Sequence, residues 1–219
     1  MFFVFVFRLD FVPMEKTLFD LPIEDVLYTR ILIHLNIHDL LNLTLINKSV
    51  TNVIRNYFKQ LKEMDFSINY TEPISEDIFT ILHENCTNLR VLNFNGCRWI
   101  TNTHLRSLIA RNINLEKISL ANCLQITLEG VEPIINCKNL THLHLAHCKL
   151  ADNHFLELLF KNNKNLNYLN LSGINNEFNE EVENVIKKKK FIYEHLKSIN
   201  HQQIISCGFF HEEIKYYSL

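Results

Sequence analysis

The most regular feature of the sequence is a phrase of alternating hydrophobic and polar positions that occurs four times between residues 88 and 174. The copies read NLRVLNFNGC, NLEKISLANC, NLTHLHLAHC and NLNYLNLSGI. Their first leucines, Leu89, Leu115, Leu140 and Leu166, are 26, 25 and 26 residues apart. A fixed period of this length is typical of a solenoid, in which each repeat stacks on its neighbours.

Each copy predicts a short strand followed by a turn and a helix. The apolar side chains stand at the first, fourth and sixth positions, as in Leu89, Leu92 and Phe94. The spacing of two predicts a strand with one buried face, because successive strand side chains point to opposite sides. Helical spacing follows, for example at Leu105 and Leu108. We therefore predict an α/β fold, a short solenoid with a curved parallel sheet inside and helices outside.

The repeat pattern is imperfect at both ends. A degenerate copy, Leu61, Met64 and Phe66, precedes the first full one, and the match fades beyond Phe178. We assign residues 61–219 to the repeat array, with a divergent cap at its C-terminal end.

Cysteine recurs at two positions of the repeat. Cys97, Cys123 and Cys148 stand where the chain leaves the strand, a place for a small side chain that donates weakly to a neighbouring backbone carbonyl. No Cys-x₂-Cys pair is present, so we predict no metal site. Three residues before the first leucine, two cysteines alternate with two asparagines: Cys86, Asn112, Cys137 and Asn163.

The N-terminus argues against secretion. Its first residues, MFFVFVFRLDFVPM, have no basic region ahead of the apolar run and no small-residue cleavage site, and the run is too short to span a bilayer. We expect residues 1–16 to be a disordered extension, with Met1 or Met14 as the start. The six cysteines should then be free thiols in a reducing compartment.

Residues 17–60 follow a different pattern, with apolar residues at helical spacing. Pro22 and the acids after it are typical of a helix start, and Asn36 and Asn47 are placed to open two further helices. Three short helices cannot bury all their leucines against one another, so part of this apolar surface is expected to face a partner. The alternative is that these helices only cap the solenoid.

Charge and motifs exclude several classes of function. The chain has 22 basic and 24 acidic side chains, so no basic footprint points to nucleic acid or an anionic membrane. It has no G-x-S-x-G, no glycine-rich phosphate loop and no H-E-x-x-H, and its four glycines leave little for a loop around a cofactor. We predict a protein that is not an enzyme, binds no cofactor and acts through protein partners.

The strand positions between the buried leucines should form the inner face of the sheet. This face is polar and nearly uncharged, without an arginine pair to hold a phosphate, so we expect recognition by hydrogen bonds and shape. A merely solvated sheet would look similar, and the histidines there are expected to be exposed rather than metal ligands. The candidate substrate-binding residues are Val91, Asn93, Asn95, Lys117, Ser119, His142, His144, Tyr168 and Asn170.

Both segments resemble known families. The pattern L-x-x-L-x-L-x-x-C, followed shortly by Ile-Thr, is similar to the cysteine-containing leucine-rich repeat that is frequent in F-box proteins. The segment LPIEDVL…HLNIHDLLNLTLINKSV resembles the F-box itself, so residues 17–60 are assigned as a three-helix F-box. It departs at Val50, where the family often has tryptophan, and at Asn47, where it has cysteine. The matching positions are Leu21, Pro22, Glu24, Val26, Leu27, Leu35, Asp39, Leu40, Leu41, Leu43, Leu45 and Lys48.

The resemblance implies a substrate-recognition adaptor of an SCF-type (Skp–cullin–F-box) E3 ubiquitin ligase. The F-box would bind the Skp-type linker, and through it a cullin, while the repeats would hold a protein substrate for ubiquitination and proteasomal degradation. The alternative is a leucine-rich-repeat scaffold, or an assembly or inhibitor protein, that acts outside ubiquitination. The implied adaptor-binding residues are Leu21, Pro22, Val26, Leu27, Ile31, Leu35, Leu40, Leu41 and Leu45.

The expected location is the cytoplasm, with the nucleus left open. The run KKKK at residues 187–190 matches a nuclear signal, but it also follows EEVENVI. Acids at the start of a helix and bases at its end are what the helix dipole favours, so we predict a helix here.

Overall fold

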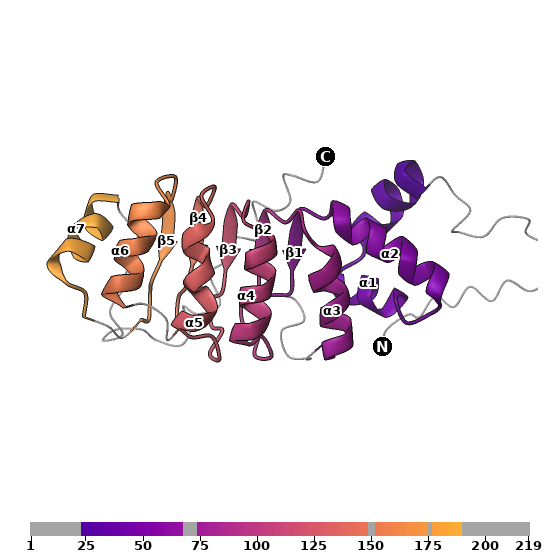
Figure 1. Cartoon of the computed structure of the whole chain (residues 1–219), viewed down its shortest axis with the longest axis horizontal. Coiled ribbons are helices and arrows are strands. Elements are labelled where there is room, and N and C mark those ends of the chain that lie inside the picture. Colours follow the sequence, from indigo (N-terminus) through magenta and orange to yellow (C-terminus); the bar gives the residue numbers. More distant parts are fainter. Residues whose placement is uncertain (1–22, 68–73, 149–151, 175–176, 190–219) are drawn as a thin grey trace, which may run out of the picture. The chain divides into compact units, whose positions relative to one another are not determined.

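The computed structural model describes residues 23–67, 74–148, 152–174 and 177–189 (Figure 1). The predictions made for residues 1–16, for Leu21 and Pro22, and for the chain past residue 189 lie outside this part. The chain divides into two compact units between Gln60 and Leu61, where the hydrophobic pattern changes from helical to alternating.

The first unit consists of helices and turns. Two predicted helix starts are confirmed: the side-chain oxygen of Asn36 accepts a hydrogen bond from the N–H of Asp39 at 2.9 Å, and that of Asn47 accepts one from the N–H of Val50 at 3.0 Å. The elements are η2, a π-helix (Ile23–Ile31), the 3₁₀ turn η3 (Leu32–His34), α1 (Ile37–Leu43) and α2 (Lys48–Gln60).

Aromatic contacts and apolar burial join the helices of this unit. The hydroxyl of Tyr28 in η2 donates to the carbonyl of Val53 in α2 at 3.2 Å, and the rings of Tyr28 and Tyr57 lie 5.2 Å apart. Leu27 of η2 and Ile54 of α2 are fully buried. The periodic apolar stripe of each helix therefore forms a core, as an amphipathic pattern dictates.

The second unit contains a parallel five-stranded sheet whose strands follow one another in chain order. The predicted α/β fold with a parallel sheet is thus confirmed, and the degenerate copy forms the first strand, with Met64 and Phe66 buried. The strands are β1 (Glu63–Asp65), β2 (Val91–Asn93), β3 (Lys117–Ser119), β4 (His142–His144) and β5 (Tyr168–Asn170). Their central residues are register partners across the sheet: Met64, Leu92, Ile118, Leu143 and Leu169.

The helices that follow the strands lie side by side over one side of the sheet, from α3 to α6 (Figure 1). In α4 the predicted helical positions Leu105, Leu108 and Ile109 are buried. The helices of this unit are α3 (Glu76–Asn85), α4 (Asn102–Arg111), α5 (Leu128–Val131), α6 (Asn153–Asn162) and α7 (Glu180–Lys189).

One repeat departs from the predicted pattern of strand, turn and full helix. Its helix α5 has only four residues and continues as the 3₁₀ helix η5 (Glu132–Asn136). Pro133 lacks a backbone donor, and Gly130 is a weak helix former, so a longer α-helix is disfavoured. Gly130 also admits Asn102 of α4, whose Oδ1 would lie 2.5 Å from an added Cβ.

The helix predicted around the lysine run is confirmed. Helix α7 has Glu180, Glu181 and Glu183 in its first turn and three lysines in its last. Lys187 forms an ion pair with Glu183 at 2.7 Å. Both features are favourable for a helix, because the charges oppose its dipole and the pair has i, i+4 spacing.

Every strand from β2 to β5 ends in the same turn, which needs a positive φ at one position. Gly96 and Gly173 have φ of 76° and 73°, whereas Asn122 and His147 adopt 61° and 58° as non-glycine residues. Glycine adopts this conformation without strain, and asparagine tolerates it better than most residues.

Gly173→Ala is expected to lower the free energy of unfolding by about 2 kcal/mol, because alanine is strained at positive φ. An added Cβ would also lie 2.1 Å from the Nδ1 of His147. Urea unfolding of the full chain measures the loss. In a His147→Ala background the loss should shrink to about 1 kcal/mol, since only the backbone strain remains. Equal losses in both backgrounds would rule out the steric contact.

The alternating cysteines and asparagines before each first leucine join neighbouring repeats. The side-chain NH₂ of Asn112 donates to the carbonyl of Cys86 at 2.9 Å, and that of Asn163 donates to the carbonyl of Cys137 at 2.6 Å. Each asparagine thus binds the backbone of the cysteine in the preceding repeat. All four residues are buried, so loss of either bond would leave a buried polar group without a partner and lower the stability.

Candidate functional site

The strand-end cysteines are structural. Their thiols donate to a carbonyl of the strand end of the preceding repeat, as predicted, and burial raises the pKa of both Cys97 and Cys148 to about 12 and that of Cys123 as well. A thiol in this state is a poor nucleophile. The three bonds are Cys97 to Phe66 at 3.6 Å, Cys123 to Phe94 at 3.0 Å and Cys148 to Leu120 at 2.8 Å.

These thiols are expected to resist alkylation in the folded protein. At pH about 8, maleimide should label them roughly a thousandfold more slowly than in urea, because a pKa of about 12 leaves almost no thiolate. Mass spectrometry of a Cys207→Ser variant, which removes a cysteine outside the described residues, counts the labelled sites. Rapid labelling of the native chain at Cys97 or Cys148 would show that these thiols are accessible.

Two other kinds of site are not found in the part of the chain that the structure describes. Within those residues, no three or more His, Cys, Asp or Glu side chains are grouped so that they could hold a metal ion. No described helix has the length and apolar character needed to cross a membrane.

Eight of the nine predicted substrate-binding residues are brought together on the strands, on the face of the sheet opposite the helices, here called the inner face; the ninth, Asn95, lies in the turn after β2. Strand register arranges them in rows that run across all five strands. One row is Glu63, Val91, Lys117, His142 and Tyr168; another is Asp65, Asn93, Ser119, His144 and Asn170.

The second row is far less accessible than expected. Asn93 and Asn170 are 4% exposed, His144 is 2% exposed and Ser119 is 1% exposed. The prediction of exposed histidines is therefore wrong for His144. Strands lie about 4.8 Å apart, so side chains in one row pack against their neighbours, and small Ser119 lies between two larger partners.

Two of the candidate asparagines use their side chains inside the fold. The Oδ1 of Asn93 accepts a hydrogen bond from the N–H of Asn95 at 3.0 Å, and the Oδ1 of Asn170 accepts one from the N–H of Ser172 at 2.9 Å. These bonds hold the turn after the strand, in the manner of an Asx turn. These bonds account for asparagine at both positions, whether or not the residues also take part in recognition.

Three aromatic rings from β4 and β5 are in contact on the inner face. The rings of His142 and Tyr168 stack at 5.7 Å, and that of His144 meets Tyr168 edge-on at 6.3 Å. Burial lowers the pKa of His144 to about 4, with the nearby His147 as a further cause. Its Nε2 and the Oγ of Ser119, the register partner of His144, are buried without a hydrogen-bond partner.

The leucines of the first unit divide into buried and accessible ones. Leu27, Leu40 and Leu41, expected to touch an adaptor, are at most 3% exposed and stabilise the unit's own packing. The expectation that these three leucines contact an adaptor directly does not agree with their burial, because the apolar side of an amphipathic helix packs inward. Among the other predicted contacts, Leu45 is 67% exposed, while Val26, Ile31 and Leu35 are partly buried.

The turn between α1 and α2 presents two large aliphatic side chains to solvent. We call Leu45 and Ile46, which are 67% and 61% exposed, the aliphatic turn. The hydroxyl of Thr51 donates to the carbonyl of Thr44 at 2.7 Å and holds the turn against α2. Sequence reasoning missed Ile46, although its place directly before the helix-opening Asn47 indicates a turn.

The chain is thus an α/β protein in which a helical unit is followed along the sequence by a leucine-rich-repeat-like array. No family model matches the chain. Among solved structures, the chain is similar to the tropomodulin C-terminal domain of Caenorhabditis elegans, with 19% sequence identity and a TM-score of 0.43. The match covers 64% of this chain and 95% of that one.

Proposed function

We propose that the chain is the substrate-recognition adaptor of an SCF-type E3 ubiquitin ligase, most like the F-box/LRR-repeat protein 15 type in its sequence pattern. The aliphatic turn carries the proposal, because it sets two exposed aliphatic side chains next to each other. It belongs to a helical unit in which Leu27, Leu32, Leu40 and Leu41 are buried. Adjacent exposed apolar side chains provide contiguous apolar surface, which is a feature of protein interfaces. Leu45 is also one of the positions that match the F-box pattern.

In this proposal the work is divided between the two units. The helical unit binds the Skp-type linker and through it a cullin, while the repeat unit binds the protein to be ubiquitinated. The chain holds its substrate and leaves the transfer of ubiquitin to other subunits, so it needs neither a catalytic residue nor a cofactor. Its expected place of action is the cytoplasm.

The test is binding of the full chain to a purified Skp-type linker protein. The double change Leu45→Glu and Ile46→Glu should weaken binding by about 100-fold, since two aliphatic side chains lose their burial and charges replace them. Leu40 and Leu41 are unsuitable targets because they are buried. Surface plasmon resonance measures the affinity.

A matched control lies in the repeat unit. Ile113 and Leu124 are also exposed aliphatic residues, at 57% and 56%, and Ile113→Glu with Leu124→Glu should leave linker binding unchanged. If the wild-type chain does not bind the linker, the proposal is wrong. A repeat scaffold that acts outside ubiquitination then becomes the better account.

A further inference from the structure

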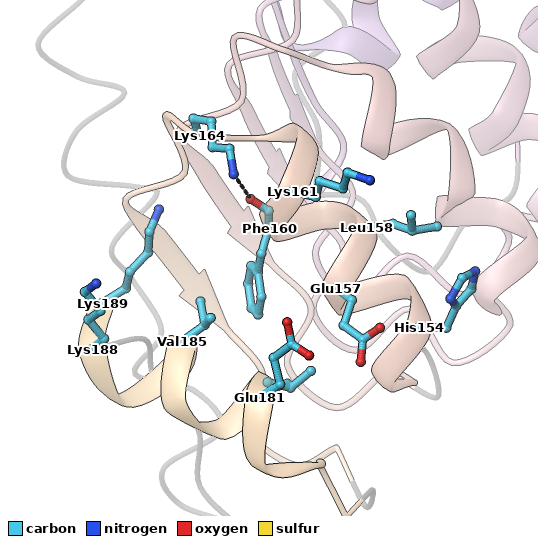
Figure 2. A pocket seen from close by; sticks show the side chains of 11 residues that line it. His154, Glu157, Leu158, Phe160, Lys161, Lys164, Glu181, Val185, Lys188 and Lys189 are labelled. Carbon is cyan, nitrogen blue, oxygen red and sulfur yellow. Dashed lines mark hydrogen bonds between the residues drawn. The ribbon is translucent and has the colours of Figure 1, made fainter.

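A groove of about 600 Å³ lies between α6 and α7, at the C-terminal end of the described repeats (Figure 2). This volume is within the range of ligand-binding sites. Apolar side chains of both helices line it, among them Leu158 of α6 and Val182 and Val185 of α7. Figure 2 shows Leu158 and Val185 on the two helices that border the groove.

Helix α7 is held by hydrogen bonds near both of its ends. Asn179, just before α7, donates from its side-chain NH₂ to Glu157 of α6 at 2.8 Å. In the last turn of α7, the ammonium of Lys189 donates to the carbonyl of Leu166 at 3.0 Å. Between these bonds Val182 and Ile186 are buried, so α7 packs inward on that side and leaves Val185 partly exposed at the groove.

The groove is positively charged on balance. Four lysines line it, Lys161 and Lys164 from α6 and Lys188 and Lys189 from α7, against two glutamates. Among the described residues, no carboxylate lies within ion-pair distance of Lys161, Lys164 or Lys188. Lys164 donates only to a neutral group, the carbonyl of Phe160, at 3.3 Å.

We infer that this groove binds a short peptide segment that carries both acidic and apolar side chains. Its carboxylates lie among Lys161, Lys164 and Lys188, for which the described residues provide no ion-pair partner. The apolar side chains lie on Leu158 and Val185, which are partly exposed, in the manner of an amphipathic helix in a groove. If the chain is the proposed ligase adaptor, on which this assignment of the ligand rests, the segment belongs to the substrate.

Two features favour a peptide over a nucleic acid. Glu157 and Glu181 line the same groove and would repel a continuous chain of phosphates. The apolar lining offers a phosphodiester backbone nothing, whereas it suits leucine or valine side chains. The groove is also the more accessible surface, because the second row of the inner face is almost fully buried.

The probe is a fluorescein-labelled helical peptide of leucine and glutamate, about ten residues long to match the length of α6 and α7. Fluorescence anisotropy with the full chain measures its affinity. Binding should weaken as salt is added. The double change Lys161→Glu and Lys188→Glu should weaken it by about tenfold or more.

The matched control changes the same net charge elsewhere. Lys62 and Arg98 are exposed and do not line the groove, so Lys62→Glu with Arg98→Glu should leave the affinity within about twofold. A charge swap separates electrostatics from unfolding: a peptide with lysine in place of glutamate should bind the Lys161→Glu, Lys188→Glu variant better than it binds the wild type.

Three outcomes would overturn the inference. They are equal affinity of the acidic peptide for wild type and groove variant, no rescue by the charge swap, and tighter binding of an oligouridylate of equal charge. The proposed function fails by a different result, loss of the interaction between the wild-type chain and the Skp-type linker. If the chain binds the peptide but not the linker, the peptide site in the groove is supported and the proposed ligase function is wrong.

Discussion

Asn112→Ala is expected to lower the free energy of unfolding of the repeat unit by about 3 kcal/mol, because three buried hydrogen bonds end on this one side chain. Its Oδ1 accepts from the N–H of Leu89 at 2.9 Å, and its NH₂ donates to the carbonyls of Cys86 and Leu108 at 2.9 and 2.8 Å. Alanine leaves these groups buried without a partner. Urea unfolding of the full chain, followed by circular dichroism, measures the change.

Asn163 provides the matched comparison, since it occupies the same position two repeats later. Its NH₂ donates to the carbonyl of Cys137, but its Oδ1 is buried without a partner. Asn163→Ala should therefore cost only about 1 kcal/mol. Equal losses for the two asparagines would contradict the assignment of stability to the individual hydrogen bonds.

Acidification from pH about 7 to about 5 is expected to cost the folded protein about 2 kcal/mol through His144 alone. Burial lowers the pKa of this imidazole to about 4 in the folded chain, against about 6.5 when unfolded. Above the unfolded pKa the ring is neutral in both states and has no effect. Between the two values only the unfolded chain takes up the proton, so stability falls as the pH falls and levels off below about 4.

The variant His144→Asn isolates the contribution of His144 to the pH dependence of stability. It keeps a polar side chain in the second row of the inner face and removes the titrating imidazole. Thermal unfolding of wild type and variant over this pH range gives the two stability curves. The wild type should lose more stability toward acid than the variant does. Parallel curves would show that His144 is solvated and titrates with an ordinary pKa.

The sequence alone predicts the features that depend on local spacing. The repeat period, the strand positions and the helix starts at Asn36 and Asn47 are all confirmed, because each follows from residues within a few positions of one another. The role of the strand-end cysteines is confirmed for the same reason. The broken helix of one repeat depends on Gly130 and Pro133, which the repeat period does not take into account.

The solvent exposure of individual side chains could not be predicted from the sequence. A helical stripe marks Leu27, Leu40 and Leu41 as apolar but does not separate residues of the core from residues of an interface. On the inner face, alternation places His144 correctly, yet its burial depends on neighbours in other repeats. The groove has no local signal in the sequence, since its lining comes from two helices, α6 and α7, that are separated along the chain.

The alternation of cysteine and asparagine before each first leucine has a consequence for how such an array changes its length. Each asparagine donates to the backbone carbonyl of the cysteine in the preceding repeat. The smallest unit that contains both partners of this bond is therefore a pair of repeats. Insertion or removal of a pair conserves every such bond. Loss of a single repeat would place two cysteines or two asparagines in neighbouring repeats. In evolution and in protein engineering alike, the array should therefore be lengthened or shortened more easily by two repeats at a time.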